Sequence, residues 1–436
     1  MEALLEMARK ASEQAEVYSL EESSDGVDFE DGKLKDIQSK SQSGISLRIL
    51  RQGKLGFAYT RNLIYRQELL QNALDSLKGE VEALFDLPGT QEVPSLDTYD
   101  PSIEKMTNSS IVEECSRVCA LLRQKTTGQI NVSAGRKTAR IRLINSQGID
   151  FSSRFSVYYF NAEILYPGSH ASIHRPFFSK RFEKIPDASL DFILDLYLRS
   201  SKEVSPKGGK MKVLFLPETL YALIWRIQSA TNGKNVYQKI SPIMEKLGTA
   251  ILHKKISVYN DPLDDRVPGA RSFDDEGVPC RSFPIIDHGT LANFYYDLHY
   301  AKKLNAAPTG HGFKSSGWGG EPISVKPSPA LEHLRVEAGD KPFPDLLRTI
   351  DRGIIAAGVI GAHSGNILNG DFSVGLSPGL YVEKGEILGH VKDAMMAGNI
   401  YSTMNEVIDI EDRSFPTYGG TFPAVLFDNV SVAIKG

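Results

Sequence analysis

Two stretches of alternating apolar and polar residues, one before residue 60 and one after residue 130, constrain the fold most strongly. In the first, apolar side chains recur at every second position over residues 45–49 and again over residues 55–59. In the second, they recur at Phe155, Val157 and Tyr159. A period of two places one face of a strand in a core and leaves the other in contact with water. Each stretch therefore predicts an antiparallel sheet with one buried face.

Helical spacing of apolar residues frames both predicted sheets. The expected helices cover approximately residues 2–15, 62–78, 109–125 and 187–201. This pattern predicts the α+β class of fold, with two N-terminal α/β units that each combine helices with an antiparallel sheet. We place the first unit at residues 1–95 and the second at residues 96–208, with a proline-containing connection near their boundary.

The remaining residues, 209–436, predict a large β-rich C-terminal domain. A short apolar strand at residues 211–216 leads into a helix that begins at Pro217, since the first turn of a helix tolerates proline. After Gly248 few helices are expected, and glycines recur every few residues. Glycine serves tight turns, bulges and close backbone contacts in sheets. The pattern fits a closed sheet with many turns, and also an open strand edge that binds a peptide by strand addition.

Composition and charge exclude several classes of protein. The 50 lysines and arginines are outnumbered by 54 acidic residues, and this net charge of -4 argues against a protein that coats nucleic acid. No segment approaches the roughly 18 apolar residues of a transmembrane helix. The first residues do not resemble a signal peptide, and three cysteines, an odd number, fit a reducing compartment. We expect a cytoplasmic protein with no membrane or nucleic-acid partner.

Histidines and cysteines give weak signals for a metal site. The chain lacks glycine-rich nucleotide-binding motifs, a G-x-S-x-G elbow and C-x-x-C. His170 and His174 have the spacing of two zinc ligands on a helix, but prolines bracket the segment. The favoured interpretation is two half-exposed histidines of a strand. Cys115 and Cys119 lie one helical turn apart and are expected to be buried thiols, as is Cys280.

Carboxylates cluster at Asp261, at Asp264-Asp265 and at Asp274-Asp275-Glu276. Bunched carboxylates can bind a hard cation such as Ca²⁺ or Mg²⁺. However, Arg266 and Arg271 lie close in the sequence and can neutralise them. We therefore favour surface turns, or a corner in which arginines pair with the carboxylates.

One acidic segment and one glycine-rich segment carry a family resemblance. Phe273-Asp274-Asp275-Glu276-Gly277 is similar to the FDDEG element of the TldD/PmbA family, whose members were once called modulators of DNA gyrase. Gly370-Asp371-Phe372-Ser373 resembles the GDFS stretch of that family, and the similarity continues over residues 381–386 and 396–399. The order of units resembles the family as well. The resemblance assigns no role to these motif residues.

The resemblance also implies where zinc would bind. The TldD kind carries H-E-x-x-x-H on the helix that opens the C-terminal domain; its histidines and a later cysteine hold zinc, and its glutamate is the general base. The PmbA kind, also called TldE, lacks this motif. Here the equivalent positions are Trp225, Arg226 and Ala230, and residues 418–422 contain no cysteine. Tryptophan and alanine offer no ligand, and arginine offers no base. The resemblance therefore implies no catalytic or metal-binding residue in this chain, and zinc only in a TldD-like partner.

The function that the resemblance implies belongs to a complex. A PmbA/TldE-like chain would be the non-catalytic subunit of a cytosolic TldD/TldE-type zinc metallopeptidase that acts on small or unfolded peptides. Its expected partner is a TldD-like subunit in a heterodimer, or a second copy in a homodimer, and no activity is expected of the chain alone. Two alternatives stay open: a self-sufficient hydrolase with an unrecognised site, and a peptide-binding or regulatory module without hydrolysis.

Overall fold

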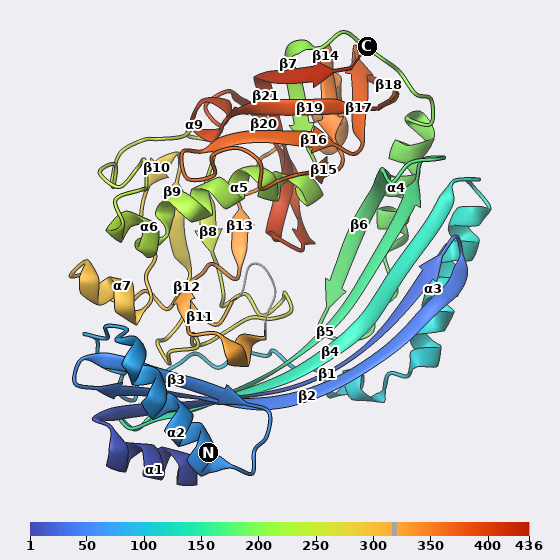
Figure 1. The fold of residues 1–436 in the computed structure, drawn as a ribbon. Helices are drawn as coiled ribbons and strands as arrows, with labels where there is room; N and C mark the ends of the chain where they lie inside the picture. The colour runs from blue at the N-terminus through green and yellow to red at the C-terminus, as the bar shows by residue number, and fades with distance from the viewer. Residues whose placement is uncertain (316–320, 436) are drawn as a thin grey trace.

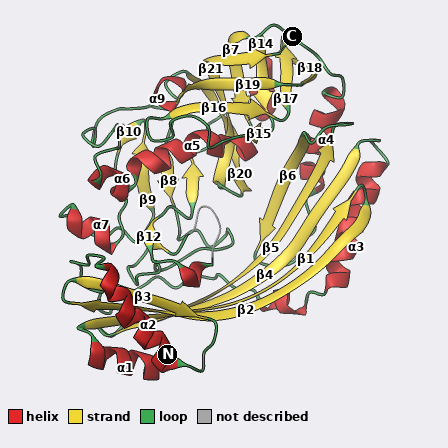
Figure 2. Cartoon of the chain, in the orientation of Figure 1, coloured by secondary structure: helices red, strands yellow, loops and turns green. Residues whose placement is uncertain are grey.

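A long, curved antiparallel sheet and a sheet-rich C-terminal domain face each other in the computed structural model of the chain (Figure 1). The structure describes residues 1–315 and 321–435. Figure 2 shows the strands of the curved sheet running side by side along most of its length, with helices at both of its ends. The prediction of an α+β fold, with helices and antiparallel sheet first and a large β-rich domain last, is confirmed.

The curved sheet contains six strands in the order β3-β2-β1-β4-β5-β6 within the described residues, and every neighbouring pair is antiparallel. The strands are β1 (Gln14–Glu30), β2 (Lys33–Arg51), β3 (Lys54–Thr60), β4 (Gln129–Asn145), β5 (Asp150–Leu165) and β6 (Ser172–Ser179). Because β1 pairs with both β2 and β4, the strands of the two predicted N-terminal units form one sheet. The unit boundaries near residues 95 and 208 stay a prediction.

Burial alternates along β5, as the sequence predicts. However, the fully buried side chains lie on the opposite face from Phe155, Val157 and Tyr159. Tyr158 and Phe160 are fully buried, whereas Val157 is half-buried. Helices α3 (Asn108–Arg123) and α4 (Asp187–Arg199) pack on the face that holds Tyr158. The face that holds Val157 borders a cleft beside the C-terminal domain. Both faces carry apolar residues, so the period alone could not identify the helix-covered one.

Two further helices cover the end of the sheet near β3. Helices α1 (Glu2–Ala11) and α2 (Arg66–Ser76) bury Leu4 and Leu69 against Leu47 of β2. The first helix ends earlier than residue 15, because the chain becomes extended at the start of β1. The shorter 3-10 helices are η1 (Leu77–Gly79), η2 (Pro101–Lys105) and η3 (Pro322–Ser324).

The C-terminal domain is built on a mixed sheet of thirteen strands, counted within the described residues. Strand β7 lies near its centre, antiparallel to β21 and parallel to β14. The strands are β7 (Gly209–Phe215), β8 (Val258–Asn260), β9 (Phe283–Asp287), β10 (Thr290–Leu291), β13 (Leu334–Val336), β14 (Arg352–Ala356), β15 (Val359–Ile360), β16 (Asp371–Leu376), β17 (Gly379–Glu383), β18 (Glu386–Val391), β19 (Ala394–Asn399), β20 (Val407–Thr417) and β21 (Gly420–Ile434). A separate pair is formed by β11 (Gly312–Phe313) and β12 (Ser328–Pro329).

Helix α5 (Pro217–Thr231) follows β7 directly and packs against this sheet, as Figure 1 shows. Proline at its first position costs no hydrogen bond, because the first N–H groups of a helix have no partner within the helix. Leu220 and Leu223 enter the core beside Phe215 and Phe427. The remaining helices are α6 (Gly233–Tyr237), α7 (Leu298–Lys303), α8 (Phe343–Arg348) and α9 (Ile400–Thr403). None of the helices found in the described residues has the length and apolar character needed to cross a membrane.

A buried ion pair joins β6 of the curved sheet to the C-terminal domain. Arg175 donates from Nε to Oε1 of Glu218 in the first turn of α5, at 2.8 Å. Its guanidinium also stacks on the rings of Phe192 and Phe415, at 3.8 and 4.3 Å from their centroids. Glu411 of β20 lies close by, 6% exposed, and accepts a hydrogen bond from the backbone N–H of β21. Burial raises the pKa of Glu411 to about 7.

The raised pKa of Glu411 predicts a pH-dependent loss of stability. In the unfolded chain this carboxyl titrates near its ordinary value of 4.5, so between pH 4.5 and about 7 the folded state holds the extra proton. Stability therefore falls as the pH rises through that window. Glu411→Gln should remove this loss and raise the free energy of unfolding at pH 8 by up to about 3 kcal/mol, with no such gain near pH 4.

Urea unfolding of the wild-type chain and of Glu411→Gln at pH 4, 6 and 8 measures how the difference in the free energy of unfolding varies with pH. Asp412→Asn, at the more exposed neighbour, is the control and should change the free energy of unfolding by less than about 0.5 kcal/mol. A difference between wild type and Glu411→Gln that does not vary with pH would contradict the prediction.

Candidate functional site at helix α5

Arg226 occupies the middle of α5, and its side chain is fully buried. Its Nε donates to the carbonyl of Asp371 at 2.8 Å, Nη2 to that of Ser364 at 2.7 Å, and Nη1 to that of Ala362 at 3.0 Å. Nη1 also donates to the carbonyl of Ala222, one helical turn earlier. The guanidinium therefore holds the loop between β15 and β16 against the helix.

The charge of Arg226 is balanced by backbone dipoles. Burial lowers the pKa of the Arg226 guanidinium, and the nearby charge of Asp371 opposes this effect. Arginine nevertheless stays protonated in proteins, so a cation is fixed at this position. A buried cation is tolerated where its N–H groups find acceptors. Four carbonyl oxygens supply them here, while the Asp371 carboxylate accepts a hydrogen bond from Asn399 at 2.9 Å.

Zinc does not fit the residues of α5. Zinc in proteins is bound by histidine, cysteine or carboxylate. The three positions at which the family resemblance places the zinc motif hold an indole, a guanidinium and a methyl group, at Trp225, Arg226 and Ala230. Ala230 is fully buried, and its carbonyl accepts a hydrogen bond from Ser241 at 2.6 Å. In residues 1–315 and 321–435, no group of three or more histidines, cysteines or carboxylates is arranged to hold a metal ion.

The GDFS segment closes the loop that Arg226 holds. Gly370 has a φ of +87°, a conformation that side-chain-bearing residues rarely adopt. Asp371 and Ser373 lie at the start of β16, where the N–H of Ser373 donates to the carbonyl of Ser364 at 3.4 Å. Phe372 is 2% exposed and fills the domain core. The segment thus shapes the loop around α5, and its side chains do not converge on a reactive group.

The FDDEG segment forms a buried loop between β8 and β9. The Asp274 carboxylate accepts hydrogen bonds from the backbone N–H groups of Glu276 and Val278, at 2.9 Å each, and of Gly312, at 2.8 Å. Gly277 closes the turn with a φ of +80°. Asp274 therefore organises the loop internally.

Ion pairs join the FDDEG loop to the curved sheet. Arg48 of β2 donates from Nη1 to Glu276 at 2.6 Å and from Nη2 to Glu16 of β1 at 2.8 Å. All three side chains are at most 4% exposed. Asp275 accepts a hydrogen bond from Arg271 at 2.6 Å. The prediction of an arginine-paired corner is confirmed for this segment, and the alternative of a surface turn is wrong because the loop is covered by the sheet.

Lys314 adds a second buried cation to this junction. Its Nζ donates to Oγ of Ser46 and to the carbonyl of Val325, each at 3.0 Å. It also lies over the rings of Tyr18 and Phe57, at 4.8 and 4.9 Å from their centroids. Burial lowers the pKa of Lys314 to about 8, and the surrounding carboxylates partly oppose the change. Opposite charges from the two parts of the chain thus meet in a buried interface.

A cleft of about 620 Å³ lies between the curved sheet and the C-terminal domain and approaches α5 at the turn between β20 and β21. Phe155 and Phe178 line it from β5 and β6, and the ring of Phe178 meets the ring of Tyr418 edge to face at 5.3 Å. Tyr418 belongs to the turn between β20 and β21, and the neighbouring Gly419 lies against Tyr221 of α5. A cleft of this volume with apolar walls and charged rims suits an organic ligand or a short stretch of peptide.

The other carboxylates that the sequence singled out lie at the rim of this cleft. Asp264 is paired with Arg266 through two contacts of 2.7 Å, and Asp261 lies 3.9 Å from Arg335. Asp265 accepts a hydrogen bond, at 2.8 Å, from a backbone N–H in the proline-containing connection between β3 and β4. These pairs fit the surface-turn interpretation for this part of the acidic cluster.

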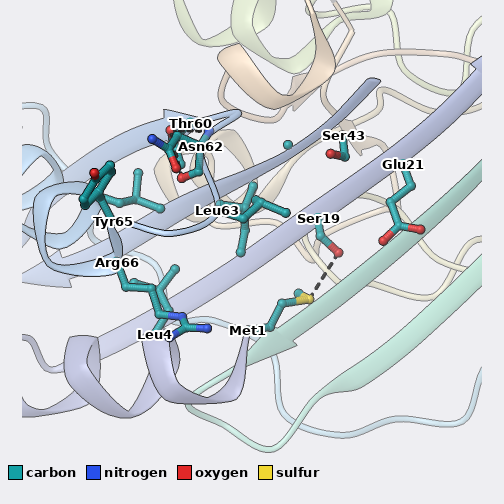
Figure 3. Close-up of a pocket in the computed structure, with 13 residues that line it drawn as sticks. Met1, Leu4, Ser19, Glu21, Ser43, Thr60, Asn62, Leu63, Tyr65 and Arg66 are labelled. Atoms are coloured by element: carbon teal, nitrogen blue, oxygen red, sulfur yellow. Dashed lines mark hydrogen bonds between the residues drawn. The ribbon is translucent and has the colours of Figure 1, made fainter. Parts of the chain in front are cut away.

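A smaller hollow of about 240 Å³ lies where α1 and α2 meet the curved sheet (Figure 3). Figure 3 shows Met1, Ser19, Thr60 and Tyr65 around it, with the Ser19 hydroxyl donating to the sulfur of Met1 at 3.1 Å. No buried charged side chain points into it. It therefore offers less chemistry than the cleft beside α5.

The histidine and cysteine candidates lie apart from both hollows. His170 is exposed in the turn before β6, and His174 is half-buried in β6 opposite Glu163, so only the second is a strand histidine as predicted. Cys115 and Cys119 are buried against the curved sheet, and burial raises the pKa of Cys119 to about 11. Cys280 is buried as well, and burial raises its thiol pKa. Protonated, buried thiols are inert.

The partners of the motif residues were not identified from the sequence. Arg48, Glu16 and Arg175 all lie on strands of the curved sheet, far along the chain from the segments with which they pair. One feature of the sequence could have predicted that Arg48 has a buried partner. Arg48 interrupts an apolar run and turned out to be buried, and a charged residue in a buried strand requires a partner.

A strand that opens into a helix, a buried FDDEG corner and a glycine-rich loop held on that helix define the sheet-rich domain of a metallopeptidase-type fold. The family model described as the PmbA/TldA metallopeptidase C-terminal domain matches residues 208–434, and the model of domain 1 of that family matches residues 15–82. The chain belongs to the PmbA/TldD family.

Relatives match over nearly the whole length of the chain. An uncharacterized protein of Methanocaldococcus jannaschii is 24% identical and covers 94% of this chain and 95% of its own length. Metalloprotease PmbA of Escherichia coli O157:H7 is 23% identical, with coverage of 94% and 91%. The crystal structure of TldE from Thermococcus kodakarensis superimposes with a TM-score of 0.89 at 20% identity, over 99% of both chains. The fold is therefore that of TldE.

We expect the Arg48 ion pairs to be required for stability. Arg48→Leu would leave Glu16 and Glu276 buried without a cation, which should lower the free energy of unfolding by roughly 3–5 kcal/mol. Lys54→Leu, in an exposed pair with Glu80, is the matched control and should cost less than about 1 kcal/mol. Equilibrium denaturation measures both. Equal effects of the two substitutions would contradict a buried network.

The hydrogen bonds from Arg226 to the loop between β15 and β16 can be tested by substitution. Arg226→Met keeps an unbranched apolar stem, shorter than that of arginine, and removes four hydrogen bonds to carbonyls, and should lower the free energy of unfolding by about 3 kcal/mol. Amide hydrogen exchange over residues 361–371 should rise more than elsewhere. Ser229→Ala, a half-exposed change on the same helix, should leave both quantities unchanged. Unaltered exchange in the loop of the Arg226 variant would refute the assignment.

Proposed function

We propose that this chain is the non-catalytic, PmbA/TldE-like subunit of a cytoplasmic TldD/TldE-type zinc metallopeptidase complex that acts on small or unfolded peptides. One observation carries the proposal: Arg226, at the position where the resemblance places the general base of the TldD kind, has a guanidinium that is fully buried on four carbonyls. A cation that is already coordinated by the backbone can neither accept a proton from water nor bind zinc.

The surroundings of α5 support a role in shaping a peptide-binding chamber. The cleft beside the helix retains aromatic walls from both parts of the chain and charged pairs at its rim. Such a surface can orient an extended peptide without reacting with it. In the proposed heterodimer, the catalytic zinc, its ligands and the general base come from the TldD-like partner, and this chain contributes a wall of the chamber.

The cleft also supports a second candidate function, a peptide-binding module that does not take part in hydrolysis. Its aromatic walls and volume suit a peptide whether or not a catalytic partner is present. The two functions differ in what happens when a TldD-like chain is added, because only the first predicts cleavage.

The decisive experiment compares the chain alone, a TldD-like chain encoded in the same genome, and the two coexpressed. Zinc is measured by mass spectrometry of the metal, and cleavage of an unstructured reporter peptide by mass spectrometry of the products. We expect no stoichiometric zinc and no cleavage for this chain alone, and both for the complex. Replacing the glutamate of the partner's H-E-x-x-x-H motif by glutamine should slow cleavage by about 100-fold or more.

Two other outcomes would each support one of the alternative functions. One zinc ion per chain, or cleavage by the purified chain alone, would establish a self-sufficient hydrolase and overturn the proposal. Peptide binding without cleavage in the coexpressed sample, although the partner holds zinc, would favour the binding module.

A further inference from the structure

A groove of about 480 Å³ lies where helix α4, which covers part of the curved sheet, approaches the C-terminal domain (Figure 1). Three phenylalanines line it, and the rings of two of them, Phe192 of α4 and Phe343 of α8, meet edge to face at 5.2 Å. The third is Phe415 of β20. We call this hollow the Arg175 groove, because the guanidinium of Arg175 stacks on Phe192 and Phe415 and belongs to its lining. Its volume and apolar walls suit a small organic ligand.

Arg175 has unused hydrogen-bond donors in this groove. Its side chain is 5% exposed, and the acceptor that it reaches within residues 1–315 and 321–435 is Oε1 of Glu218, through Nε. Arginine carries further N–H groups on both Nη atoms, and these donate no hydrogen bond within the same residues. An arginine that serves only to neutralise a carboxylate commonly forms two parallel hydrogen bonds with it. Here Oε2 of Glu218 is buried without a hydrogen-bond partner, so the Nη groups do not complete such a pair.

The carboxyl groups that line the Arg175 groove are already compensated. Asp195 and Glu386 both pair with Arg199, at 3.4 and 3.3 Å. Asp412 lies 3.7 Å from an exposed arginine. Glu411 accepts a hydrogen bond from the backbone of β21, and burial raises its pKa to about 7, so this carboxyl is mostly uncharged at pH 6. An anion that enters the groove at that pH therefore meets unused guanidinium donors, while the acidic side chains are paired or protonated.

We propose that the Arg175 groove binds a small organic carboxylate with an aromatic body. The two Nη groups of an arginine form a planar fork that matches a carboxylate through two parallel, charge-assisted hydrogen bonds. The phenylalanine rings of the walls provide offset or edge-to-face contacts for an aromatic ligand. A neutral amide of the same shape can occupy the walls but cannot complete the charge-assisted pair. The proposal therefore predicts discrimination between an acid and its amide.

The Arg175 groove is separate from the cleft that carries the proposed peptide chamber. Successive residues of a strand point to opposite faces of a sheet. On β20, Phe415 lines the groove, whereas Ser414 and Pro416 line the cleft. On β6, Arg175 lines the groove, whereas Phe178 lines the cleft. The two hollows thus lie on opposite sides of the same strands, so this inference is independent of the proposed function and either can fail alone.

Isothermal titration calorimetry of the purified full chain at pH 6 tests the recognition of a carboxylate. The probes are N-acetylphenylalanine, 3-phenylpropionate and, as the neutral control, N-acetylphenylalanine amide. Both carboxylates should bind saturably with one site per chain, and the amide should bind at least about tenfold more weakly, because it lacks the charge-assisted hydrogen bonds. A short peptide that ends in phenylalanine, with a free or an amidated C-terminus, distinguishes the two sources of such a group. Binding of the free-ended peptide shows that a peptide terminus can supply the carboxylate, and binding of the small acids alone assigns the groove to free acids.

Two variants locate the binding in the groove. Ser189→Trp places a bulky ring in it from a half-buried position on α4 and should weaken the binding of N-acetylphenylalanine by about tenfold or more. Leu198→Trp is the matched control, because Leu198 is exposed on the same helix outside the lining, and it should leave the affinity unchanged. Arg175→Leu/Glu218→Leu removes both members of the buried pair, so that no lone charge remains, and should abolish the preference for the acid over the amide.

The inference is overturned if the native chain binds neither carboxylate, or binds the acid and the amide with equal affinity. It is also overturned if binding survives Ser189→Trp in a protein whose urea unfolding matches that of the native chain. Because Ser189→Trp leaves the ion pair of Arg175 and Glu218 intact, the test does not depend on the folding of the double variant.

Discussion

The buried guanidinium of Arg226 is the constraint on which the character of this protein depends. A cation in the middle of α5 can be accommodated only if the backbone surrounds it with acceptors. The chain meets this requirement by folding the loop between β15 and β16 over the helix, so that carbonyls of Ala362, Ser364 and Asp371 point at it. Catalysis by a metallopeptidase needs the reverse arrangement, in which a base and metal ligands are accessible to water and substrate. The two arrangements cannot occupy the same helix.

The two parts of the chain are connected by buried charge at two separate places. Near one end of the molecule Arg48 of β2 pairs with Glu276, and near α5 Arg175 of β6 pairs with Glu218. A buried ion pair contributes little net stability compared with apolar packing, but it penalises any arrangement that separates its members. With both pairs intact, the separation of the cleft walls is fixed.

Much of this architecture could be predicted from the sequence, because local patterns determine it. Period-two alternation identified the long strands, proline at the first position located the start of α5, and the paucity of helices after Gly248 marked the β-rich domain. Two features could not be predicted in this way. The pairing of β1 with β4 joins segments more than 100 residues apart, and no local pattern encodes it. The buried face of β5 depends on which face α3 and α4 cover, which is a property of the assembled fold.

For the candidate site too, some features could be predicted from the sequence and others depend on the assembled fold. The identities of Trp225, Arg226 and Ala230 predict that these three side chains do not bind zinc, since a side chain without a ligand atom cannot gain one by folding. The sequence could not show what Arg226 does instead, because its acceptors are backbone carbonyls about 140 residues away, and carbonyls carry no sequence signal.

The roles of the FDDEG and GDFS segments can also be described only from the structure. The FDDEG segment contains three acidic residues and was considered as a cation site, and the GDFS segment contains one, Asp371. In the fold, Asp274 accepts three backbone hydrogen bonds and Asp371 accepts one from Asn399. The FDDEG segment keeps a loop in place against the curved sheet, and the GDFS segment keeps the loop between β15 and β16 in place on α5. Their hydrogen bonds serve the backbone of the fold and do not require a metal on α5.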